Sequence, residues 1–138
     1  MDGDQVVREL ERRFLPALRR AEAEINAGFP GVRAEAWSQP HGQATDSPGY
    51  VIALSCYFPD APADQPDEVT LELCVGGIGG PKPSLEADVI WGCPGQVELD
   101  LFPGSVAMSE DAVQRIEAEL PRLVQVLQAA VRRGRPGK

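Results

Sequence analysis

The central part of this 138-residue chain has almost no positive charge. Between Ala34 and Gln114 there is one cation, Lys82, against thirteen carboxylates, so this stretch has a net charge of −12. The other twelve Lys and Arg residues flank it, and the whole chain has a net charge of −8. Because nucleic acids and anionic lipids repel acidic proteins, we expect no nucleic-acid partner and no membrane partner. The shortage of cations instead favours a basic protein as the partner.

Metal-binding and nucleophilic residues are equally scarce. His41 is the single histidine, and no CxxC pair is formed by the three cysteines, Cys56, Cys74 and Cys93. Without clustered Cys and His, HExxH or an EF-hand signature, we expect no metal and no cofactor. The cysteines are interpreted as reduced thiols that pack as small hydrophobic residues, and His41 as a surface turn residue.

The Gly-rich segment 76–83 contains no phosphate-binding signature. It lacks GxxxxGK[ST] and leads into a predicted strand, so it offers no helix N-terminus to a phosphate. We interpret it as a flexible connection between two strands.

Long hydrophobic runs are also absent. No stretch approaches the roughly 18 apolar residues of a membrane-spanning helix, and the N-terminus MDGDQVVREL lacks the features of a secretory signal. These features predict a cytoplasmic protein. The length predicts one α+β domain over residues 1–138, ending in a short basic tail at residues 134–138. Eleven arginines against two lysines favour a bacterial source with a GC-rich genome.

Two amphipathic helices are predicted, one at each end of the chain. Apolar residues recur at three- and four-residue steps over about residues 4–27 and 110–133, which gives each helix one apolar stripe. Ser109 is a good N-cap for the second helix. Pro16 and Pro121 interrupt the two patterns, so each helix is expected to kink or to split.

Five strand-like segments lie between the helices. Turn residues such as those of segment 39–42 separate them, and short connections of this kind are typical of an antiparallel meander. We therefore predict an α+β fold, α-β-β-β-β-β-α, with both terminal helices packed on one face of a five-stranded antiparallel sheet. The predicted strands are residues 32–38, 50–58, 68–75, 84–91 and 97–102.

Strand alternation assigns most central carboxylates to the other face of the sheet. The apolar residues of each strand should meet the helices, and the carboxylates should meet water. The same alternation turns Val51, Ala53 and Ser55 towards solvent. The predicted partner-binding residues of this face are Glu35, Trp37, Tyr57, Glu68, Glu72, Glu86, Asp88, Glu98 and Asp100.

These carboxylates have few neighbouring cations. Like charges on adjacent strands cost a few tenths to about 1 kcal/mol per opposed pair, and Lys or Arg would usually relieve that repulsion. The face is therefore either a solvated surface that favours solubility or a docking surface for a basic protein, with the aromatic residues as anchors.

Three classes of function suit this pattern. A non-enzymatic immunity protein would neutralise a basic toxin, such as a nuclease, by covering its nucleic-acid-binding groove. A secretion-chaperone-like protein would hold an export effector, although such chaperones usually have a helix between strands and none is predicted here. A small-molecule-binding protein or a carboxylate-dependent enzyme needs an inward-facing acid or a pocket, and alternation predicts neither. Homodimerisation through the helices or an edge strand is compatible with each class.

Overall fold

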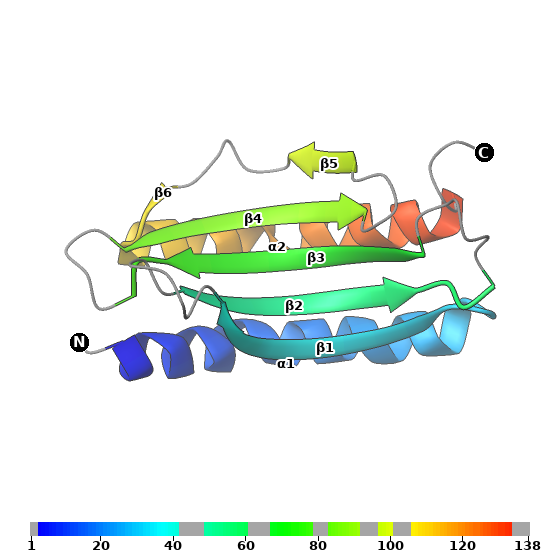
Figure 1. Cartoon of the computed structure of the whole chain (residues 1–138), viewed down its shortest axis with the longest axis horizontal. Helices are drawn as coiled ribbons and strands as arrows, with labels where there is room; N and C mark the ends of the chain where they lie inside the picture. Colours follow the sequence, from blue (N-terminus) through cyan, green and yellow to red (C-terminus); the bar gives the residue numbers. More distant parts are fainter. Residues whose placement is uncertain are drawn as a thin grey trace.

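The computed structural model describes residues 3–41, 49–60, 67–78, 83–91, 97–100 and 106–133. Helix α1 (Gly3–Gly28) precedes the strands and helix α2 (Glu110–Arg133) follows them. Both helices lie behind the sheet in Figure 1, α1 beneath one edge and α2 behind the other half. The observed helix boundaries agree with the predicted ones to within one residue, because the caps and the apolar stripes mark them clearly.

Four long strands form an antiparallel meander. They pair in sequence order: β1 (Arg33–His41), β2 (Gly49–Tyr57), β3 (Glu68–Gly76) and β4 (Ser84–Trp91). Two short strands, β5 (Val97–Asp100) and β6 (Val106–Ala107), both pair with β4.

The predicted α+β fold, with terminal helices and an antiparallel sheet, is confirmed, but the count of five full strands is wrong. Four strands are full length, and the chain beyond β4 adds two short segments in place of a fifth strand. Alternation over residues 97–102 indicates a strand but does not fix its length, which depends on how far it pairs with β4.

Strand β1 lies at an edge of the sheet and runs three residues beyond its predicted end, through Pro40. Proline is tolerated there because an edge strand leaves alternate N–H groups unpaired. Helix α1 supplies partners along that edge. The Asn26 amide donates to the Ala34 carbonyl at 3.1 Å and accepts the Ala34 N–H at 2.8 Å, and Glu22 accepts the Ala36 N–H at 3.3 Å. These bonds cover an edge that would otherwise be open to another strand.

Neither proline splits its helix. Helix α1 is continuous through Pro16, and α2 is continuous through Pro121. Both prolines are exposed, so water can replace the intrahelical hydrogen bond that each one removes. The predicted N-cap is confirmed, because Ser109 Oγ accepts the Ala112 N–H at 3.0 Å.

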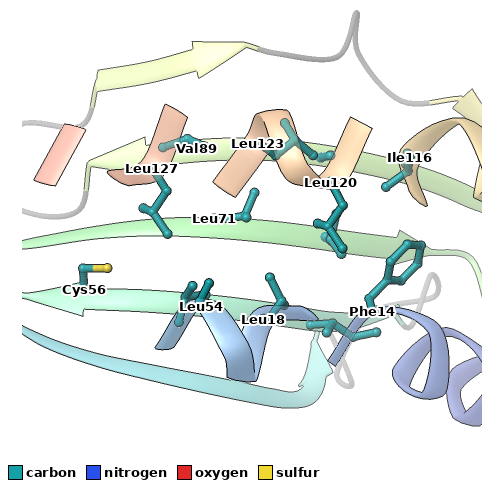
Figure 2. Packing of buried hydrophobic residues seen from close by; sticks show 14 of the residues in the cluster. Phe14, Leu18, Leu54, Cys56, Leu71, Val89, Ile116, Leu120, Leu123 and Leu127 are labelled. Atoms are coloured by element: carbon teal, nitrogen blue, oxygen red, sulfur yellow. The ribbon is translucent and has the colours of Figure 1, made fainter. Parts of the chain in front are cut away.

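The hydrophobic core lies between the sheet and the helices. Helix α1 packs mainly on β1 and β2, and α2 packs on β3 and β4. Figure 2 shows Leu18 of α1 near Leu54 and Leu127 of α2 near Leu71, with the ring of Phe14 further along α1. All five side chains are fully buried.

The helical layer pairs many of its charges. Arg13, whose side chain is only 14% exposed, joins the two helices by contacting Glu117 at 2.8 Å and Glu110 at 3.0 Å. Its hydrogen bond to Glu117 raises the pKa of Arg13. Ion pairs within single helices join Arg12 to Glu9 and Arg122 to Glu119. In the described part of the chain, no helix is long and apolar enough to cross a membrane.

Candidate functional site

The sheet face turned away from the helices carries the central carboxylates, and we call it the acidic face. None of its residues belongs to the core cluster between sheet and helices. Its described side chains are Arg33, Glu35, Trp37, Gln39, Val51, Ala53, Ser55, Tyr57, Glu68, Thr70, Glu72, Cys74, Glu86, Asp88 and Ile90. Among these side chains, five are carboxylates and one is a cation.

The strand register places three acidic residues in one row across the sheet. Glu72 is opposite Asp88, and Asp88 is opposite Asp100 of β5 on its other side. Only the backbone of β5 is described, so the position of Asp100 in this row follows from the register. Opposed carboxylates on neighbouring strands repel each other by a few tenths to about 1 kcal/mol per pair when both are ionised.

The other predicted carboxylates are spread around that row. Glu35 is opposite Ser55, Glu68 is opposite Tyr57, and Glu86 is opposite Cys74. Glu98 is opposite Ile90 by register, with its side chain outside the described set. The structure therefore places all seven predicted carboxylates at positions of one face, with Glu72, Asp88 and Asp100 directly adjacent.

The centre of the acidic face is less accessible to solvent than alternation predicts. Val51, Ala53 and Ser55 point away from the helices as expected, but all three are buried. They are small residues between the larger side chains of β1 and β3, and Trp37 is directly opposite Ala53. Alternation therefore predicted correctly which face these three residues lie on, and predicted wrongly that they are exposed to solvent.

Exposure also differs among the carboxylates. Asp88 is only 7% exposed, so the prediction that it meets water is wrong. Glu35 is exposed, and Glu68, Glu72 and Glu86 are half-buried. Asp88 lies at the centre of its row, flanked by strands on both sides, whereas Glu35 belongs to an edge strand. A partner would therefore reach the outer carboxylates more readily than Asp88.

A chain of hydrogen bonds crosses three strands of the acidic face. The Trp37 indole N–H donates to Ser55 Oγ at 2.8 Å, and Ser55 Oγ lies 2.9 Å from Thr70 Oγ1. The Thr70 hydroxyl donates to the Glu68 carboxylate at 3.2 Å. Because the Thr70 proton is used in that bond, the Ser55 hydroxyl donates to Thr70. The buried hydroxyls of Ser55 and Thr70 are thus satisfied, and the indole of Trp37 is held in one orientation.

Tyr57, the second predicted aromatic anchor, is covered by a cation of its own chain. The guanidinium of Arg33 lies 5.1 Å from the centroid of the Tyr57 ring, within the range of a cation–π contact. The strand pattern placed Tyr57 on this face but gave no indication that Arg33 stacks on it.

The thiols of the two described cysteines have low reactivity. Cys56 lies in the core, and burial raises the pKa of its thiol to about 12. Cys74 lies on the acidic face, where its thiol donates to the Glu72 carboxylate at 3.4 Å. Burial first, and then the charge of Glu72, raises the pKa of Cys74 to about 12. Since the thiolate is the nucleophilic form, neither thiol is suited to nucleophilic catalysis near pH 7.

These raised thiol pKa values predict a loss of stability at alkaline pH. In the folded protein these pKa values are about 12, above the ordinary value of 9.0. The contribution of the protonated thiols to the free energy of unfolding is therefore complete below about pH 9 and is lost between about pH 9 and 12. We expect Cys74→Ala to reduce that loss, because alanine has no proton to release. Urea unfolding from pH 8 to 11 measures the free energy of unfolding of the wild type and of Cys74→Ala. Tyrosines and lysines also titrate in this range, but they are the same in both proteins, so their contribution drops out of the difference. Equal pH dependence in the two proteins would contradict the raised pKa of Cys74.

A shallow groove of about 480 Å³ lies between the helices, on the opposite side of the molecule from the acidic face. Three of its four charged lining residues have partners within the groove: Glu117 pairs with Arg13, and Glu24 accepts a hydrogen bond from Gln128 at 3.3 Å. Among the described residues, no group of three or more His, Cys, Asp and Glu side chains is arranged to hold a metal ion.

Some sequence predictions concern residues outside the described ranges. These are Lys82 with half of its Gly-rich segment, Cys93, the last two residues of the predicted strand 97–102 and the tail at residues 134–138. For His41, the backbone ends β1 and the side chain is not described.

Sequence reasoning missed Ser55, Thr70 and Arg33 as parts of the site. A signal for the first two was present, because both are polar residues at outward positions of otherwise apolar strands. Their bond to Trp37 depends on the pairing of three strands, which one sequence does not specify. No known protein family, curated protein or solved structure matches this chain.

Proposed function

We propose that this chain is a non-enzymatic protein-binding module whose acidic face engages a basic protein. The observation that supports this proposal is the contrast between the two layers. The helices pair charges with each other, as Arg13 does with Glu110 and Glu117, whereas the described acidic face has five carboxylates and one guanidinium. Its described carboxylates lie on three of the four long strands, and cations of a partner would find acceptors on each of them.

The proposed partner is a basic toxin, such as a nuclease, and the chain is its immunity protein. A nuclease holds its substrate through Lys and Arg side chains that contact phosphates. A sheet face with rows of carboxylates offers those side chains an alternative set of anionic acceptors and would block substrate entry. Opposite charge on the two surfaces would also accelerate association.

The neighbouring open reading frame provides the test of this assignment. We expect its product to be basic, to arrest growth of a host cell when expressed alone, and to be neutralised when this chain is co-expressed. The purified pair should form a complex whose affinity falls between about 0.05 and 0.5 M salt, because the Debye length shortens to a few ångströms over that range.

Two results would contradict the assignment. A harmless export effector held by the chain would replace the immunity function with that of a secretion-chaperone-like protein. A toxin complex whose affinity is insensitive to salt would rule out docking through the acidic face.

A further inference from the structure

Trp37 is the aromatic residue of the acidic face that has no cation stacked on it among the described residues. Its indole N–H is already bonded to Ser55 Oγ at 2.8 Å, so the ring does not require an acceptor from a partner. The side chain is half-buried, and its remaining accessible part belongs to the acidic face. What the ring still offers is its electron-rich surface, which attracts cations.

Carboxylates lie on both sides of Trp37. Glu35 is two residues away on the same strand, and therefore on the same face at a distance of about 7 Å along the strand. Across the sheet, Trp37 is opposite Ala53, and Ala53 is opposite Glu72. Ala53 is small and fully buried, so no large side chain of β2 separates the indole from Glu72. A cation above Trp37 would thus be within reach of acceptors from two strands.

The same face already contains one cation seated in this way. The Arg33 guanidinium stacks on Tyr57 at 5.1 Å, and Tyr57 is opposite Glu68 in the register. An aromatic ring beside a carboxylate therefore holds a guanidinium at one end of the acidic face. Trp37 has the same kind of surroundings, with the guanidinium position open to a second molecule.

We propose, on the basis of the proposed function, that the acidic face recognises arginine side chains of its partner in preference to lysine. Trp37 is the stacking platform, and Glu35 and Glu72 are the acceptors. A guanidinium can stack through its plane while its N–H groups bond carboxylates at its edge, whereas the ammonium of lysine is a compact and strongly hydrated charge. Ser55 is a positioning residue, because its hydroxyl fixes the indole on the face.

Synthetic octa-arginine and octa-lysine peptides test this preference at equal charge. Isothermal titration of the wild-type chain at low salt should show that octa-arginine binds about two- to fivefold more tightly, the ratio expected for one exposed cation–π contact. In NMR spectra, the Trp37 indole resonance, assigned by its loss in Trp37→Leu, should shift with octa-arginine and much less with octa-lysine.

Two variants separate a recognition role from a structural one. Trp37→Leu removes the ring, so both peptides should bind equally, with the affinity that octa-lysine has for the wild type. Ser55→Ala keeps the Trp37 ring and removes the hydrogen bond that orients it, so the affinity for octa-arginine should fall while the affinity for octa-lysine stays unchanged. If either residue had a purely structural role, its substitution would lower the affinity for both peptides to the same degree. If Trp37→Leu fails to fold, the wild-type ratio and Ser55→Ala still decide the matter.

Each remaining outcome is decisive. Equal, salt-sensitive binding of both peptides by the wild type would overturn the arginine preference and leave the proposed function in place. A preference that persists in Trp37→Leu would also overturn it. If neither peptide binds at low salt, both the arginine preference and docking through the acidic face are wrong.

Discussion

Phe14→Ala is expected to destabilise the protein by about 3–5 kcal/mol, a large share of the total stability of a domain of this length. Phe14 is fully buried and belongs to the same cluster as Leu71 of the sheet and Ile116 of α2. Figure 2 shows its ring projecting from α1 into the layer between the helices and the strands. Because three elements meet there, they cannot all move to fill the space that the ring leaves.

Urea unfolding followed by circular dichroism measures this effect, and the neighbouring residue provides the control. Leu15 lies on the same helix and is only half-buried against the core. Leu15→Ala should therefore cost only about 1 kcal/mol, since less apolar surface is lost from the interior. If the two substitutions cost the same, the packing of α1 on the sheet would differ from that described above.

The helices were the most predictable part of the fold. Their signals are local: a stripe of apolar residues in each helix and a serine cap at Ser109. The end of β1 was not predictable, because Pro40 favours a turn unless the strand lies at an edge. Whether a strand lies at an edge depends on the order of all the strands, which local patterns do not contain.

The acidic face was predicted in outline and missed in detail for the same reason. Alternation within a strand gives the side on which each residue lies, and it placed Glu72 and Asp88 together. It does not give exposure, which for Asp88 depends on the strands beside it. It also cannot reveal that Trp37 bonds Ser55, 18 residues away, or that Arg33 stacks on Tyr57.

Charge reversal on the acidic face has the largest expected effect on binding. We expect Glu35→Lys, Glu72→Lys and Glu86→Lys together to reduce affinity for a basic partner at least about a hundredfold, because attraction is replaced by repulsion at three positions. These residues are exposed or half-buried, so lysine can be accommodated. Asp88 is left unchanged, because a lysine at a 7% exposed position would place a longer side chain and a largely desolvated charge in the sheet.

A matched variant on the helices shows whether the loss of affinity depends on the location of the substitutions or only on the net charge. Glu9→Lys, Glu24→Lys and Glu119→Lys change the net charge by the same amount. In the native protein, these side chains contact Arg12, Gln128 and Arg122, respectively. Losing such surface contacts costs at most about 1 kcal/mol each, so this variant should also fold.

The most direct test of the central claim is the affinity of the two folded triple variants for octa-arginine, measured by isothermal titration at low salt. Docking through the acidic face predicts that the sheet variant loses far more affinity than the helix variant, since the helices lie on the other side of the sheet and their side chains do not contact a peptide bound to the acidic face. Equal losses in both variants would mean that net charge alone governs binding. Either that result or retained binding by a folded sheet variant would contradict docking through the acidic face.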